Sequence, residues 1–162
     1  MMTNVILGID PGLNGGIAII DKYKNIVETE IIPTIDGKFI DIPKLNFLIY
    51  NFAPNHVYLE KVSAMPKQGV ASMFSFGKTC GIIEALIVAN NIPYTMVTLQ
   101  AWQKVIHEGL DKTLNPKVRS EIIFKRLFPD QHLKATERSK KNHDGMLDAL
   151  MIALYGHKQF HW

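Results

Sequence analysis

Cysteines and long apolar runs are scarce in this chain. Its 162 residues include one cysteine, Cys80. No uninterrupted apolar stretch reaches the roughly 18 residues that a membrane-spanning helix requires. A lone cysteine excludes an internal disulfide and a zinc site built from several thiolates. The opening residues also lack the basic start, long apolar segment and small-residue cleavage site of a signal peptide. We therefore expect a cytoplasmic, intracellular protein with no membrane partner.

Internal repeats, low-complexity segments and linkers are absent from the sequence as well. Apolar residues make up 47% of the chain and charged residues 20%, which are ordinary values for a globular protein. The length suits one domain with a well-buried core. We expect a single domain over residues 1–162.

Positive charge is modest in total but uneven along the chain. The formal net charge is +3. Residues 100–141 contain ten Lys and Arg against five Asp and Glu, whereas residues 1–99 contain seven against eight. A local basic excess is typical of a face that contacts nucleic-acid phosphates, and it is equally compatible with a solvated lysine-rich surface.

Apolar periodicity and turn residues divide the chain into ten expected elements. Short runs rich in β-branched residues predict strands at residues 4–9, 17–20, 26–32, 56–59 and 94–97. Helical spacing predicts helices at residues 43–52, 70–90, 99–107, 117–127 and 144–155. Residues 33–41 are expected to form a loop. Three antiparallel strands, followed by strands that alternate with helices, indicate an α/β fold with a mixed five-stranded sheet and helices on both faces.

Four carboxylates stand out by their positions. Asp10 ends the first expected strand and Glu60 ends the fourth, while Asp144 and Asp148 are one turn apart on the last helix. These positions can converge at one end of a mixed sheet. Carboxylates packed together repel one another, and a hard divalent cation such as Mg²⁺ or Mn²⁺ relieves that repulsion. The pattern therefore predicts a divalent metal site.

Each acid also has a simpler interpretation. Asp10 could be a turn residue, Glu60 a solvated strand end and Asp144 a helix N-cap. Asp148 is harder to explain in this way, because it interrupts the apolar helical segment 146–154. A charge in such a segment needs a partner or a metal.

The motifs around these acids are Gly8–Gly12, Leu59–Val62 and His143–Leu150. Together they resemble motifs of the RuvC family of Holliday-junction resolvases. The segment Gly8–Gly12 is similar to the opening strand motif of that family, Leu59–Val62 to its second acidic motif, and His143–Leu150 to its C-terminal acidic helix in the bacteriophage-type form. Met65–Gly81 is similar to the loop and helix after the second acid. Gln100–Lys104 and Lys117 fit the family's basic segment. The likeness covers nearly the whole chain.

This resemblance implies an RNase H-like fold and a crossover junction endodeoxyribonuclease that acts on four-way and other branched DNA. It implies a homodimer, in the host cytoplasm if the chain is phage-encoded. Two Mg²⁺ or Mn²⁺ ions would be held by Asp10, Glu60, Asp144 and Asp148. They would activate water and stabilise the leaving 3′-oxygen, so that each nick leaves a 5′-phosphate and a 3′-hydroxyl.

Basic residues complete the expected site. The resemblance makes Lys117 a catalytic candidate beside the four acids. We expect DNA contacts from Lys67, Gln68, Lys104, Lys112, Lys117, Arg119, Lys140 and Lys141. An apolar face of the expected helix at 70–90 would form either the dimer interface or core; its residues are Val70, Met73, Phe74, Ile82, Ile83 and Leu86.

Two positions depart from the family pattern. Bacterial RuvC proteins place the last two ligands three residues apart, but Gly145 occupies that position here, so Asp144 is the expected ligand. His143 would be an outer ligand, a proton shuttle or a residue flanking the helix. The family also places an aromatic wedge after the second acid, where this chain has Ser63-Ala64-Met65; Met65 or Phe74 are the candidates to replace it.

Three other functions are compatible with parts of the pattern. A flap- or branch-cleaving nuclease would use the same acids with looser substrate choice. A non-catalytic junction-binding module would keep the fold without the chemistry. Actin-like ATPases and sugar kinases also carry an Asp-x-Gly turn after the first strand, where it binds phosphates, but they need two such domains, and 162 residues cannot hold both.

Overall fold

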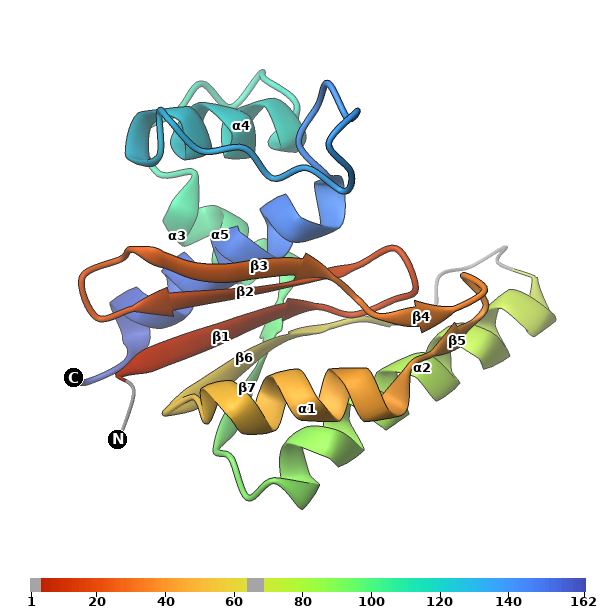
Figure 1. Ribbon diagram of the computed structural model, residues 1–162. Helices are drawn as coiled ribbons and strands as arrows, with labels where there is room; N and C mark the ends of the chain where they lie inside the picture. Colours follow the sequence, from red (N-terminus) through yellow and green to blue (C-terminus); the bar gives the residue numbers. More distant parts are fainter. Residues whose placement is uncertain (1–3, 64–68) are drawn as a thin grey trace.

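A five-stranded mixed sheet forms the centre of the computed structural model, which describes residues 4–63 and 69–162 (Figure 1). Its elements in chain order are β1 (Val5–Asp10), β2 (Gly16–Asp21), β3 (Ile26–Ile31), β4 (Thr34–Ile35), β5 (Phe39–Ile40), α1 (Ile42–Phe52), β6 (His56–Lys61), α2 (Val70–Ala89), β7 (Tyr94–Thr98), α3 (Leu99–Ile106), α4 (Pro116–Leu127) and α5 (Asp144–Gln159).

The strands lie in the order β3-β2-β1-β6-β7. β1, β2 and β3 form an antiparallel meander, whereas β6 runs parallel to β1, and β7 runs parallel to β6. Ile9 pairs with Leu59 across β1 and β6. The next residue on each strand is an acid, Asp10 or Glu60, so the register brings both carboxylates to the same edge of the sheet.

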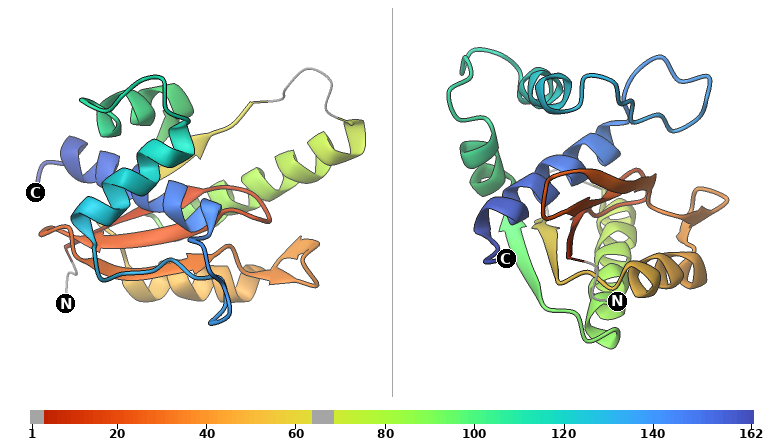
Figure 2. Two further views of the ribbon diagram at one scale, coloured as in Figure 1. Left: turned by 90° about the horizontal axis from the view of Figure 1, so that it is seen from above. Right: turned by 60° about the vertical axis from the view of Figure 1, so that its left-hand side comes forward.

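Helices cover both faces of this sheet (Figure 2). α5 packs against β1 and β2 on one face, and α3 and α4 lie outside it. α1 and α2 cover the opposite face. Alternate residues of β1 supply the two cores: Ile6 belongs to the α5 side, and Leu7 and Ile9 belong to the α1–α2 side. This period-2 division of an almost wholly apolar strand is expected where both faces are buried.

The predicted fold class is confirmed, and the differences are local. Residues 33–41, expected as a loop, contain the short hairpin β4–β5. Its turn is Asp36-Gly37, with positive φ at both residues and a hydrogen bond from the Lys38 amide to the Ile35 carbonyl. This is a favoured two-residue hairpin turn, but two-residue strands are too short to show a periodicity. α5 also continues to Gln159, beyond the expected end near residue 155.

Backbone contact between β1 and α5 depends on Gly8. A Cβ at Gly8 would overlap the Ala149 carbonyl oxygen and the Ala153 amide nitrogen. Glycine therefore allows α5, which bears Asp148, to lie directly on the strand that ends at Asp10. The same approach brings the acidic helix to the acidic edge of the sheet.

Gly8→Ala should lower the free energy of unfolding by about 2–3 kcal/mol, because the added methyl group has to displace helix backbone. Urea unfolding followed by circular dichroism measures the change. Gly69→Ala, just before α2, is the matched control, because an added Cβ there comes no nearer to another atom than 4.0 Å, at the Ser72 Oγ. It should change stability by less than about 1 kcal/mol. Equal stability of the two variants would contradict the role assigned to Gly8.

Candidate active site

Asp10 is the most strongly perturbed acid at the candidate site. It is the last residue of β1 and is partly buried. Burial, and next the negative charges of Glu60 and Asp148, raise its pKa from 3.8 to about 8. The three carboxylates come from β1, β6 and α5. Because Glu60 and Asp148 raise the pKa of Asp10, the fold brings both of them close enough to repel its charge. Such a cluster favours binding of a cation.

Glu60 is held in place by a buried tryptophan. The indole Nε1 of Trp102 donates a hydrogen bond of 2.7 Å to Glu60 Oε2. Trp102 is 0% exposed and lies on α3, which directly follows β7 beside β6. Burial raises the pKa of Glu60, and the tryptophan hydrogen bond opposes that rise. Sequence reasoning grouped Trp102 with the basic segment and missed this positioning role, because only the fold brings α3 to the end of β6.

α5 supplies the other two acids in different environments. Asp148 is half-buried, and burial, and next Glu60 and Asp144, raise its pKa to about 6. Asp144 is exposed and forms an ion pair with the Lys117 ammonium. The N-cap of α5 is His143, whose Nδ1 accepts the Met146 amide at 3.3 Å, so the N-cap alternative for Asp144 was wrong. The positive charge of Lys117 also acts on Asp148 and lowers the pKa of that carboxyl, against the larger effects that raise it.

Gly145 explains why the two acids of α5 are four residues apart. It forms a bridge with Gly15, and a Cβ at Gly145 would overlap the Gly15 backbone and the Asn14 carbonyl oxygen. A carboxylate three residues before Asp148 would therefore be excluded by the turn between β1 and β2. The only neighbouring position that is acidic and on the same helical face is Asp144.

The chemistry of these donors fits a hard divalent cation. All four are carboxylates, and two of them have pKa values raised by burial and mutual repulsion. Across residues 4–63 and 69–162, no three His, Cys, Asp or Glu side chains already stand at mutual metal-binding distance. In this conformation the acids interact electrostatically but are too far apart to coordinate one ion together. The metal site is therefore inferred from the chemistry of the four donors.

Most of the predicted DNA-contacting residues border two open cavities, each of about 620 Å³. One lies beside Asp144 and is lined by Lys140 and Lys141. The other is lined by Lys104, Lys112 and Arg119. Lys67 and Gln68 lie outside the described residues, as does the wedge candidate Met65.

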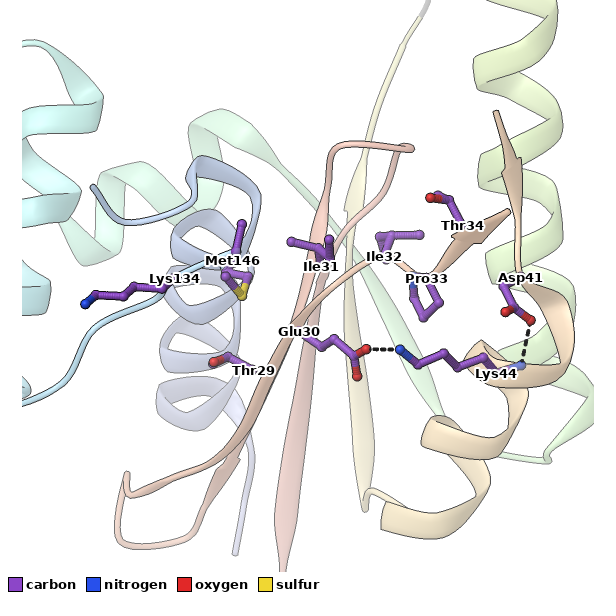
Figure 3. Close-up of a pocket in the computed structure, with 11 residues that line it drawn as sticks. Thr29, Glu30, Ile31, Ile32, Pro33, Thr34, Asp41, Lys44, Lys134 and Met146 are labelled. Atoms are coloured by element: carbon purple, nitrogen blue, oxygen red, sulfur yellow. Dashed lines mark hydrogen bonds and ion pairs between the residues drawn. The ribbon is translucent and has the colours of Figure 1, made fainter. Parts of the chain in front are cut away.

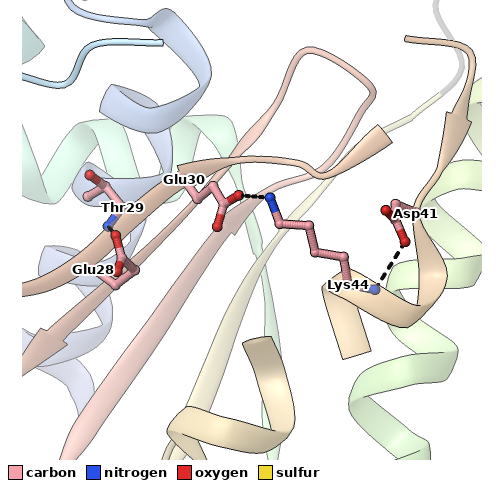
Figure 4. Close-up of polar contacts among 5 residues, drawn as sticks. All are labelled: Glu28, Thr29, Glu30, Asp41 and Lys44. Atoms are coloured by element: carbon pink, nitrogen blue, oxygen red, sulfur yellow. Dashed lines mark hydrogen bonds and ion pairs between the residues drawn. The ribbon is translucent and has the colours of Figure 1, made fainter. Parts of the chain in front are cut away.

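A third cavity, of about 420 Å³, lies beside β3 and has no candidate chemistry (Figure 3). The Lys44 ammonium in its wall is paired with Glu30, and Asp41 accepts the Lys44 amide at the start of α1 (Figure 4). Glu30, Asp41 and Lys44 are therefore already paired or hydrogen-bonded within the chain, and Lys134 is the remaining charged residue of the lining. Met146 of α5 also lines it, but the four acids do not.

Asp10→Asn should stabilise the metal-free protein at alkaline pH. The folded pKa of about 8 lies above the unfolded value near 3.8, so the favourable contribution of the protonated carboxyl is complete below pH 3.8 and is lost as pH rises through 8. The variant stays neutral and lacks this loss. With EDTA present, its Tm should match the wild type at pH 4 and exceed it at pH 8.

Calorimetry with and without Mg²⁺ or Mn²⁺ tests the same repulsion at Asp10 by adding a cation that would compensate it. The cation should raise the Tm of the wild type at pH 8 by more than that of Asp10→Asn, because it offsets a repulsion that the variant lacks. A wild type that is more stable than the variant at pH 8 in EDTA would refute the assigned charge burial.

No protein-family model and no curated protein matches the sequence. Solved structures match it over most of its length. Thermus thermophilus RuvC has a TM-score of 0.66 at 18% identity, covering 93% of this chain and 92% of its own. The fowlpox virus Holliday junction resolvase scores 0.60 at 15% identity, covering 96% and 99%. The yeast mitochondrial Holliday junction resolvase scores 0.59 at 16%, covering 96% and 78%. The chain therefore has the RNase H-like fold of RuvC and related resolvases, as its motifs predict.

Proposed function

We propose that this chain is a divalent-metal-dependent DNA endonuclease that resolves four-way junctions by paired nicks. The observation that carries the proposal is the convergence of Asp10, Glu60 and Asp148, from three separate elements, into one repulsive cluster on a resolvase fold. T. thermophilus RuvC was solved in complex with Holliday junction substrate. That complex supports branched DNA as the class of substrate.

The chain's own residues take distinct parts in this chemistry. Asp10, Glu60, Asp144 and Asp148 would hold two Mg²⁺ or Mn²⁺ ions. Bound there, such ions supply an activated water and stabilise the leaving 3′-oxygen, which yields a 5′-phosphate and a 3′-hydroxyl. Lys117, beside Asp144, can neutralise negative charge on the phosphate. Trp102 fixes the orientation of the Glu60 carboxylate through its indole N–H.

DNA binding would use the basic surface on either side of the carboxylates. Lys140 and Lys141 border the cavity next to Asp144, and Lys104, Lys112 and Arg119 border the second cavity. Contacts of this kind neutralise backbone phosphates and do not read base sequence. We therefore expect selectivity for the shape of branched DNA, with affinity that falls steeply as salt rises.

The direct test is to incubate a synthetic four-way junction with the protein in Mg²⁺ or Mn²⁺. The wild type should make symmetric paired nicks that a ligase can seal. Asp148→Asn should bind the junction but cleave more than about 100-fold more slowly, because even outer-shell changes around metals cost 10–100-fold. Asp130→Asn, which removes an exposed acid outside the cluster, is the matched control and should cleave normally.

Other substrates decide between this function and its alternatives. Equal cleavage of three-way and flap DNA would replace junction resolution with a broader branch-cleaving activity. Binding of the junction without any divalent-dependent nick by the wild type would favour the non-catalytic module and refute the endonuclease.

Paired nicks in a nearly two-fold symmetric junction require two related active sites, and a homodimer supplies them. We propose that α2 forms the interface. Phe74 is 77% exposed and Val70 86%, and added Cβ atoms at Gly77 and Gly81 would meet open space. This face is apolar and lets a second backbone approach closely.

The opposite side of α2 faces the core, and it contains three residues that were expected at the interface. Ile83 is 0% exposed, and Ile82 and Leu86 pack against the core on the α1–α2 side of the sheet, so these three expected interface residues belong to the fold of one chain. By length and composition, α2 would also suit a membrane span, with only 17% of an 18-residue window buried. Its attachment to the sheet through Ile83 favours a partner chain over a membrane.

Gly81→Arg should weaken dimerisation at least about tenfold, because a long charged side chain would enter the proposed contact. The monomer has room for it and should keep its Tm. Sedimentation velocity over a concentration series measures the change. Asn51→Arg on α1 adds the same charge at another exposed helix position and should sediment like the wild type. A wild type that is monomeric at every concentration would refute the interface.

A further inference from the structure

The second basic cavity contains a buried histidine that the proposed chemistry does not use. The cavity opens between α3, the loop after it and the start of α4. His107, which ends α3, is 4% exposed and lines it together with Lys104, Glu108, Lys112 and Arg119. Of the charged side chains that line the cavity with the histidine, three are cationic and one, Glu108, is anionic.

Two nitrogen atoms on residues that line this cavity lack a hydrogen-bond partner among the described residues. They are Nδ1 of His107 and Nε of Arg119, and both are shielded from solvent. The opposite ring nitrogen of His107, Nε2, lies 2.9 Å from the Ser120 hydroxyl oxygen, and Ser120 is 1% exposed. Ser120 therefore fixes the imidazole and leaves Nδ1 to bind something else. Buried polar atoms in native proteins are normally paired, so this unpaired couple, on two residues that line the cavity, indicates a ligand that side-chain movement at the cavity admits.

The chemistry of the cavity selects an anion. Burial, and next the charge of Arg119, lower the pKa of His107, so the ring is neutral at physiological pH. When Ser120 donates to Nε2, the neutral ring carries its proton on Nδ1. His107 and Arg119 then both present N–H donors, and Lys104 and Lys112 supply positive charge. A phosphate group, with several acceptor oxygens and negative charge, matches this set.

We infer that this cavity is a subsite for one backbone phosphate of the DNA, with His107 and Arg119 as its buried donors. The inference rests on the proposed function and deepens it. Its position favours DNA over a free phosphate: the Trp102 ring contacts the His107 ring edge-on at 5.6 Å, and the same tryptophan donates to Glu60. One side chain therefore separates the subsite from a candidate metal ligand. A strand lying across the carboxylates passes close to it.

Paired substitutions at His107 separate its two nitrogen atoms. His107→Gln places an amide near the Nε2 position, keeping a partner for Ser120, and removes the donor at Nδ1. His107→Asn places an amide near Nδ1 instead. Arg119→Gln removes the second buried donor and one charge, and Lys125→Gln, an exposed position on the same helix, is the charge-matched control.

Binding of a fluorescent four-way junction is measured by anisotropy in EDTA, where no cleavage intervenes, over a series of salt concentrations. His107→Gln and Arg119→Gln should each weaken binding about tenfold, and His107→Asn should stay within threefold of the wild type. Arg119→Gln should also lower the slope of log affinity against log salt by about one. Lys125→Gln should change affinity less than twofold. Thermal melts identify any variant that is unfolded, and the remaining ones carry the test.

The outcomes distinguish this inference from the proposed function. If the wild type neither binds nor nicks the junction, the proposed function fails. If the wild type binds and nicks but folded His107→Gln and Arg119→Gln behave like Lys125→Gln, the phosphate subsite alone is refuted. A thermal melt with inorganic phosphate distinguishes DNA from a free anion as the ligand of the cavity. If phosphate raises the Tm of the wild type but not of Arg119→Gln, while junction affinity is the same in both, the cavity takes a free anion and the DNA assignment is wrong.

Discussion

Repulsion among carboxylates at one edge of the sheet is the constraint around which this structure is organised. Asp10, Glu60 and Asp148 come from elements far apart in the chain. In addition to burial, the charge of Glu60 raises the pKa of both aspartates, and the charge of Asp148 also raises the pKa of Asp10. A fold gains nothing from gathering like charges in a partly buried place unless another charge compensates them. The destabilising cluster is therefore the strongest sign of function in the molecule, because acids with strongly perturbed pKa values are typical of catalytic and metal sites.

Close backbone packing holds that cluster together. Gly8 lets α5 rest on β1, and Gly145 lets the first turn of α5 touch the turn between β1 and β2. Side chains at these two positions would push the acidic helix away from the sheet edge. The helix that supplies Asp144 and Asp148 is thus fixed by two contacts that only glycine permits. The arrangement of the acids follows from this packing and not from attraction between them.

The layer formed by α3 and α4 connects the acids to the basic surface. Trp102 reaches Glu60 from inside this layer, and His107 lies against the same indole. Lys117 extends from α4 to Asp144. One helical layer thus contributes a positioning residue, a neutralising ammonium and the wall of the second basic cavity. Groups that orient a carboxylate and groups that suit phosphate binding share one packed unit, so movement of this layer would affect both.

Local periodicity and short motifs were sufficient to predict the fold class, the strands of the sheet and the four candidate acids. The sequence by itself also indicated the basic stretch. The tertiary structure alone decided that Trp102 meets Glu60, that His143 rather than Asp144 caps α5, and that His107 lines a basic cavity. It also assigned Ile83 to the core and left Phe74 exposed. These facts depend on which elements become neighbours. Contacts between residues distant in the chain leave no periodic trace along it.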